Sequence, residues 1–193
     1  MKKILISFFL FALLCSGSID LLFAQNESDE VNRLVETAVF KMDNGDFEES
    51  ILILQKAEKL DPKSALVKYE MAYAYYLKKD YKKSIKILSK LIKRDDAVDY
   101  YYQMLGNAYD NNGDPKKAIK VYGEGLKRFP ESGKLYLETG TVYYNQEDYN
   151  TAISWYEKGV EADPRFPSNY FRLAHIFLHT DYEVWGMIYG EIF

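Results

Sequence analysis

Two histidines near the C-terminus have the spacing of a metal-binding pair. His175 and His179 lie one helical turn apart, and Asp181 follows them. Imidazole nitrogens and carboxylate oxygens are ligands that zinc accepts. The residue after His175 is Ile176, so the glutamate that acts as general base in the helical zinc-protease motif is missing. Because that helix offers no clear third ligand, we expect ordinary surface histidines that bind neither a metal nor another cofactor.

No other stretch of the sequence carries a catalytic motif. The chain has no glycine-rich phosphate loop and no G-x-S-x-G, and Cys15 is its only cysteine. Acidic pairs such as Glu48-Glu49 and Glu147-Asp148 lie near expected helix starts, where they complement the helix dipole. The sequence therefore predicts a protein that is not an enzyme.

Residues 1–24 have the order of charged and apolar residues that is typical of a secretory signal. Two lysines precede an apolar run over residues 4–14. We predict cleavage near Ala24, followed by a short acidic linker over residues 25–30. The mature protein would then be exported, to the periplasm or the cell envelope.

Two alternatives to a cleaved signal stay open. The apolar run could remain in a membrane as an uncleaved anchor, although polar residues at 15–18 interrupt it and about 20 apolar residues are needed to span a bilayer. Cys15 could carry a lipid, although the residue before it, Leu14, is larger than such a site prefers.

The charge balance argues against one class of partner. The formal net charge is −4, and it becomes −5 when residues 1–24 are removed. A mildly acidic chain offers no electrostatic reason to bind nucleic acid. We therefore expect no nucleic-acid partner.

The rest of the sequence is organised by a repeat of 34 residues. Copies aligned at their turns begin at Val31, Ala65, Asp99, Gly133 and Pro167. The eighth place of every copy holds a small residue, which would let two helices approach closely. These residues are Ala38, Ala72, Gly106, Gly140 and Ala174. The predicted repeats cover residues 31–64, 65–98, 99–132, 133–166 and, as a partial copy, 167–193.

Each copy is predicted to form two helices joined by a short turn. Apolar residues recur at helical spacing, as in Ile51, Leu54 and Ala57. The turns Asn44-Gly45-Asp46 and Asn112-Gly113-Asp114-Pro115 offer a residue that tolerates positive φ, then an aspartate to cap the next helix. One hairpin cannot bury its apolar face alone, so the hairpins must stack on one another.

The third repeat carries the pattern most fully and resembles the tetratricopeptide repeat. The matching residues are Tyr102, Leu105, Gly106, Tyr109, Ala118, Tyr122 and Pro130. The resemblance extends over residues 31–193 and implies an all-α fold, a right-handed α-solenoid of stacked helix-turn-helix hairpins. It also implies that the first helices line a concave face, which binds a partner and performs no catalysis.

The ligand-facing places of the family, carried onto this chain, give a surface that is aromatic at one end and rich in amides in its middle. Rings can cover apolar side chains, and amides can bond backbone groups in both senses, which suits an extended peptide. We therefore predict a scaffold that binds another protein, while any single tyrosine could instead pack between repeats. The predicted partner-binding residues are Tyr69, Tyr73, Tyr76, Gln103, Asn107, Asp110, Asn111, Tyr144, Asn145 and His175.

An alternative function is that of a cell-envelope or polysaccharide-binding accessory protein, with Tyr69, Tyr73 and Tyr76 as stacking platforms. For the leading hypothesis, we expect that Asn107→Ala and Asn111→Ala weaken binding at little cost in stability.

Four lysines of the second repeat, Lys82, Lys86, Lys90 and Lys93, recur at helical spacing. A solvated face is the ordinary interpretation of such a pattern, and contact with an anionic lipid or polymer is the sharper one.

The C-terminal segment departs from the repeat because it keeps apolar residues such as Trp185 and Ile188 where a terminal repeat normally turns polar. This predicts a docking surface or a truncated array. Its Gly186-x-x-x-Gly190 is expected to serve close packing within the repeat and not membrane pairing, since the flanking segment is shorter than a span.

Overall fold

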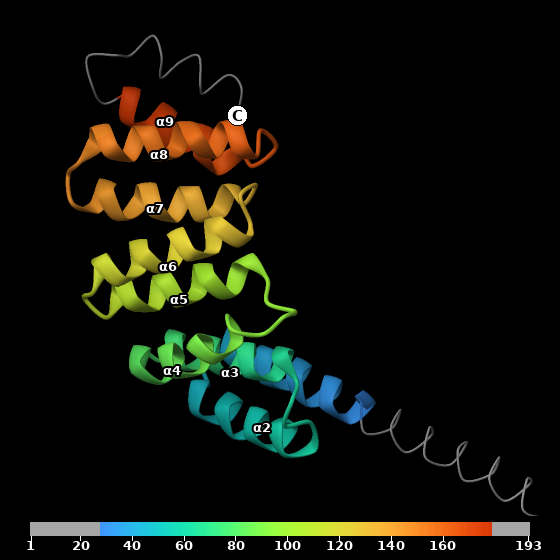
Figure 1. Cartoon of the computed structure of the whole chain (residues 1–193). Coiled ribbons are helices and arrows are strands. Elements are labelled where there is room, and N and C mark those ends of the chain that lie inside the picture. The colour runs from blue at the N-terminus through green and yellow to red at the C-terminus, as the bar shows by residue number, and fades with distance from the viewer. Residues whose placement is uncertain (1–27, 179–193) are drawn as a thin grey trace, which may run out of the picture. The chain divides into compact units, whose positions relative to one another are not determined.

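The computed structural model describes residues 28–178, and within this range every element of secondary structure is a helix (Figure 1). The first helix covers residues 28–43. The helices that follow are α2 (Phe47–Leu60), α3 (Ala65–Leu77), α4 (Tyr81–Leu91), α5 (Asp99–Asn111), α6 (Pro115–Arg128), α7 (Gly133–Asn145), α8 (Tyr149–Ala162) and α9 (Pro167–Leu178). The predicted all-helical fold is confirmed.

The first helices of successive hairpins recur at a constant spacing. Helices α3, α5, α7 and α9 begin at Ala65, Asp99, Gly133 and Pro167, each 34 residues after the last. The second helices, α4, α6 and α8, follow after short turns. The division of the chain into signal, linker and partial fifth repeat stays a prediction, since residues 1–27 and 179–193 lie outside the described range; residues 28–30, the end of the predicted linker, belong to the first helix.

The chain divides into two compact units, the first ending at Ala74 and the second beginning at Tyr75. In the first unit, the helix over residues 28–43 buries Val31, Val35, Ala38 and Met42. These residues recur every three or four positions and therefore lie on one side of the helix. Helix α2 likewise buries Ser50, Ile51, Leu54 and Ala57.

In the second unit, each helix packs on its neighbours in sequence. Helix α4 packs on α5, α5 on α6, α6 on α7, α7 on α8 and α8 on α9. The first helices also meet each other directly, α5 against α7 and α7 against α9. Figure 1 shows these helices as successive layers from green to red. This arrangement puts side chains of three first helices, α5, α7 and α9, on one shared face.

The turns between the two helices of a hairpin share one backbone conformation. Gly45 and Gly113 have φ of +82° and +85°, and Lys79 and Glu147, at the equivalent places, have φ of 64° and 62°. Only glycine adopts this left-handed region at no steric cost. The sequence therefore predicted the two glycine turns, and it gave no sign that lysine and glutamate adopt the same conformation elsewhere.

The predicted aspartate caps are confirmed in one turn and wrong in the other. The Asp114 carboxylate accepts a hydrogen bond from the backbone N–H of Lys117 at 3.2 Å, and Pro115 occupies the first turn of α6. Asp46 makes no such bond to α2. Its carboxylate lies 3.9 Å from Nζ of Lys41, which is closer to the Glu49 carboxylate, at 2.8 Å.

Glycine at the eighth place of the third and fourth repeats makes room for a tyrosine of the second helix. A Cβ atom on Gly106 would overlap the ring of Tyr122, and one on Gly140 would lie 2.5 Å from Cε1 of Tyr156. Both tyrosines are essentially inaccessible to solvent, at 1% and 0% exposure. The close approach expected from the small residues therefore exists, and it is between a helix backbone and a ring.

No helix within residues 28–178 has the length and apolar character needed to cross a lipid bilayer. The expectations for Cys15, Ala24, His179, Asp181, Trp185, Ile188 and the Gly186–Gly190 pair fall on residues outside this range.

Candidate functional site

The candidate site is a row of side chains on the first helices of the second unit, which we call the first-helix face. Three contacts define it. Asn111 Nδ2 donates to the hydroxyl of Tyr76, at the end of α3, at 3.0 Å. Gln103 Nε2 on α5 donates to Oε1 of Glu138 on α7 at 2.7 Å. The rings of Tyr144 on α7 and His175 on α9 lie 6.2 Å apart, edge to face.

Each of these contacts joins one first helix to the next. The structure thus brings Tyr76, Gln103, Asn111, Tyr144 and His175, all predicted from the sequence, into one series of contacts. Tyr69 and Tyr73 are half-buried on the part of α3 that belongs to the first unit.

Asn107 contributes to packing as well as to the face. Its Oδ1 accepts a hydrogen bond from the Tyr122 hydroxyl at 2.5 Å, and its side chain also bonds to Glu138. A buried hydroxyl that loses its acceptor costs stability. The expectation that Asn107→Ala leaves stability nearly intact is therefore corrected, whereas Asn111 is exposed and keeps that expectation.

Glu138 is central to this network but is absent from the residues predicted for the face. Burial raises the pKa of its carboxyl, while hydrogen bonds from Gln103 and Asn107 and the positive charge of Arg172 act in the opposite direction. Glu138 is the only acidic residue in the sequence of α7, whose other charged residue is Lys134. That single carboxylate on a first helix was the available signal.

The first-helix face is polar at α5 and aromatic toward α9. The polar end includes Asp110 on α5, and burial raises the pKa of its carboxyl. Toward α9 the face becomes aromatic, because the Tyr144 ring contacts both Tyr149, at 5.4 Å, and His175. The ring centroids of Phe171 and His175 are 6.4 Å apart, and Phe171 is 50% exposed. Amides and carboxyls are thus followed by an accessible cluster of rings.

Within residues 28–178, no group of three or more His, Cys, Asp and Glu side chains is arranged to hold a metal ion. His175 has aromatic neighbours in Tyr144 and Phe171. Its partner in the sequence-based zinc pair, His179, lies outside the described residues.

Glu138→Gln is expected to change how stability depends on pH. Burial raises the pKa of Glu138 in the folded chain. The stability that this group contributes is therefore fully present below its unfolded-state pKa of about 4.3, and it is lost as the pH rises through the folded-state pKa. Glutamine does not ionise. The free energy of unfolding of the variant, relative to the unmodified chain, should therefore increase between about pH 4 and pH 7.

Urea denaturation of both proteins across this pH range measures the effect. Asp110→Asn should show the same direction, since burial raises that pKa too. A stability difference between Glu138→Gln and the unmodified chain that stays constant with pH would contradict the prediction.

Comparisons with known proteins address the family and the fold. Two family models, each described as a tetratricopeptide repeat, match residues 41–108 and 104–165. No curated protein matches the chain in sequence.

Solved structures of similar fold include three with low sequence identity. A MamA crystal structure is 21% identical with a TM-score of 0.61, covering 80% of this chain and 91% of its own. Pseudomonas aeruginosa PilF is 17% identical with a TM-score of 0.69, covering 87% and 77%. YrrB, described as a TPR protein with an unusual peptide-binding site, is 15% identical with a TM-score of 0.55, covering 87% of each chain. At these identities the likeness concerns the fold alone.

Proposed function

The chain belongs to the tetratricopeptide repeat family over residues 41–165, and from this we propose that it is a non-enzymatic scaffold that holds an extended segment of another protein on its first-helix face. The family binds proteins or peptides in general, and YrrB is one structural neighbour described by a peptide-binding site. The identity of the partner segment follows from neither fact, so the proposal rests on the chemistry of the face.

The observation that carries the proposal is that exposed amides lie on first helices that hydrogen bonds join to one another. Asn111 and Asn145 occupy the same place in successive repeats, and both are exposed. Asn111 is held in place by its bonds to Tyr76 and to the carbonyl of Asn107. These bonds use both N–H groups of Asn111, so its Oδ1 remains to accept from a peptide N–H, whereas the Asn145 amide offers a donor and an acceptor. Two such amides, one repeat apart, could bond the backbone of a bound segment at two points.

The aromatic cluster beside these amides supports the same proposal. Tyr144, Phe171 and His175 lie next to one another, and half of the Phe171 side chain surface meets solvent. An exposed ring is available to cover an apolar side chain. A segment lying across α5, α7 and α9 would then place its backbone at the amides and an apolar side chain at the rings.

We further propose that the protein acts in an exported compartment, on the strength of the N-terminal sequence. N-terminal sequencing of the protein isolated from its native cells should begin at Gln25. A chain that retains Met1 in the cytoplasmic fraction would contradict export.

The test of the binding proposal is selection of peptides on the immobilised full chain from a random displayed library. Selected peptides are synthesised and titrated against the unmodified chain and against Asn111→Ala/Asn145→Ala. Each lost amide–backbone hydrogen bond is worth about 1 kcal/mol, so the double variant, which loses two, should bind roughly 30-fold more weakly.

Gln55→Ala/Asn150→Ala is the matched control, because it removes two exposed amides from second helices, α2 and α8. It should bind as tightly as the unmodified chain. Equal losses in both double variants, or no selected peptide, would overturn the proposal. Binding to an array of glycans, lost on substitution of Tyr69, Tyr73 and Tyr76, would favour the polysaccharide alternative instead.

A further inference from the structure

A separate surface of the second unit carries a regular array of lysines. On α6, Lys116, Lys120 and Lys127 are exposed, and they lie opposite the buried residues Ala118 and Tyr122. On α4, Lys82 and Lys86 are exposed in the same way opposite Ser84 and Leu88, and Lys93 is exposed just beyond the end of the helix. We call these six residues the lysine face.

The lysines of this face follow the 34-residue repeat. The lysines of α4 and α6 occupy the same three places, 34 residues apart. In α8 the equivalent residues are Asn150, Ser154 and Glu161, and in α2 they are Glu48, Leu52 and Lys59. Exposure at these places does not itself require lysine, since the exposed residues there include Asn150 in α8 and Leu52 in α2. Lysine at all three occurs only in the two second helices that flank α5.

The charges of this face are largely uncompensated. The carboxylate nearest to any of the six is that of Glu124, 4.0 Å from Nζ of Lys120, and both of those side chains are well exposed. An exposed pair at this distance neutralises little charge. Neighbouring lysines outside the face differ, since Lys83 and Lys117 pair closely with the capping residues Asp80 and Asp114.

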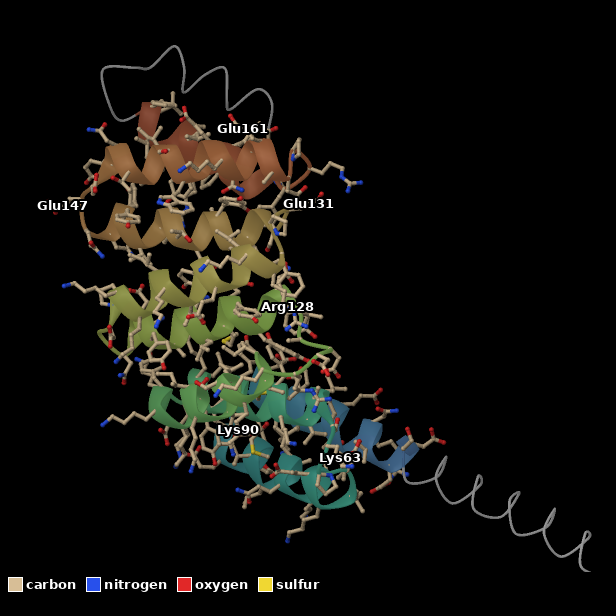
Figure 2. All side chains as sticks on the ribbon, viewed as in Figure 1. Lys63, Lys90, Arg128, Glu131, Glu147 and Glu161 are labelled. Carbon is tan, nitrogen blue, oxygen red and sulfur yellow. The ribbon has the colours of Figure 1, made fainter. Side chains whose placement is uncertain are left out.

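The two helices are also fixed to each other. Both pack on α5, and Arg128, at the end of α6, donates from Nη1 to the carbonyl of Arg94 at 3.0 Å and from Nη2 to the carbonyl of Asp95. Figure 2 shows Arg128 beside the segment that leads out of α4, with Lys90 on α4 itself. The arginine therefore ties the C-terminal end of α6 to the segment that follows α4, and both helices are held against α5.

We propose that the lysine face binds the surface of an anionic lipid bilayer. The α6 row extends over about 16 Å at 1.5 Å per residue, with no pocket needed to receive its ligand. Lysine is a flexible point charge, suited to diffuse attraction, whereas arginine favours paired bonds to a single phosphate. The residues between the lysines include the small Ser89 and Gly123, so the face has no ring at these places on which a nucleic-acid base could stack. A planar layer of negative head groups fits an extended row of flexible positive charges that has neither a pocket nor a stacking ring.

This surface is distinct from the first-helix face, because it lies on second helices. A chain bound to a bilayer through α4 and α6 would keep α5, α7 and α9 free for a protein segment. The proposal therefore does not depend on the proposed scaffold function.

The test is co-sedimentation of the full chain with vesicles of phosphatidylcholine alone or with about one-third phosphatidylglycerol. Neutral vesicles report any binding through the apolar N-terminal stretch. Binding should require the anionic lipid and should weaken strongly between about 50 and 500 mM salt. Each lysine near an anionic surface contributes roughly fivefold in partitioning, so Lys82→Gln/Lys86→Gln/Lys93→Gln should lose roughly 100-fold.

The matched control is Lys56→Gln/Lys59→Gln/Lys63→Gln, which removes the same charge from exposed residues outside the face. It should retain binding, and arginine at positions 82, 86 and 93 should restore it. Equal losses in the two glutamine variants would show that only net charge matters and would overturn the proposal. Failure to bind anionic vesicles, or binding to a single-stranded DNA oligonucleotide in preference to them, would overturn it too.

Discussion

Gly106→Leu is expected to lower the free energy of unfolding by about 3 kcal/mol or more. Gly106 faces the ring of Tyr122 so closely that even a Cβ atom would overlap it. The ring cannot move aside easily, because Tyr122 is 1% exposed and its hydroxyl is bonded to Asn107. Accommodating the added side chain must therefore push α5 and α6 apart or break that bond. Urea denaturation followed by circular dichroism measures the loss.

Gly123→Ala provides the matched control for this prediction. Gly123 lies in α6, and a Cβ atom there would meet nothing within 4 Å. Alanine is favoured over glycine within a helix by about 0.5–1 kcal/mol, so this variant should gain slightly in stability. A Gly106→Leu protein that unfolds at the same urea concentration as Gly123→Ala would show that the contact with Tyr122 does not constrain the hairpin.

Asn107→Leu is expected to cost about 1–3 kcal/mol, since it leaves the buried Tyr122 hydroxyl without its acceptor. The same change removes one of the hydrogen bonds that Glu138 accepts. The double variant Asn107→Leu/Tyr122→Phe removes donor and acceptor together and should recover part of the loss. Thermal and urea denaturation of the two single variants and the double variant give the coupling energy between the residues.

Asn111→Ala tests binding without the loss of stability that is expected for Asn107→Leu. Asn111 is exposed, and surface substitutions usually change stability by no more than about 0.5 kcal/mol. Peptide affinity should fall in this variant while its stability hardly changes. If Asn107→Leu were as stable as Asn111→Ala, the bond to Tyr122 would contribute nothing to stability. The original expectation, that Asn107 serves binding alone, would then hold.

The features of the fold that were predictable from the sequence are those that repeat. Small residues at the eighth place and helical spacing recur every 34 positions, so each copy supports the interpretation of the others. The positive φ of Lys79 and Glu147 was not predictable, because neither side chain favours that conformation and only the closed hairpin imposes it. The absent cap of Asp46 was not predictable either, because the same residue type caps α4, α6 and α8 at the equivalent places.

Prediction of the candidate site was limited by contacts that cross between helices. The pattern placed Gln103 and Asn111 on the first helices, and the structure shows them there. It could not show that Asn107 bonds to Tyr122, because the two residues lie on different helices and each is plausible in its own place. Glu138 escaped prediction for the same reason. Its role depends on amides from α5 and on Arg172 from α9, and no single repeat contains both.

The contacts along the first-helix face also bear on how the second unit opens. Where repeats touch only their neighbours, stability depends on each repeat and on each interface. The bonds from Asn111 to Tyr76 and from Gln103 to Glu138 belong to those interfaces. A segment bound across α5, α7 and α9 would add interactions at the same places. It should slow amide hydrogen exchange in all three helices together, making neighbouring repeats open as one cooperative unit.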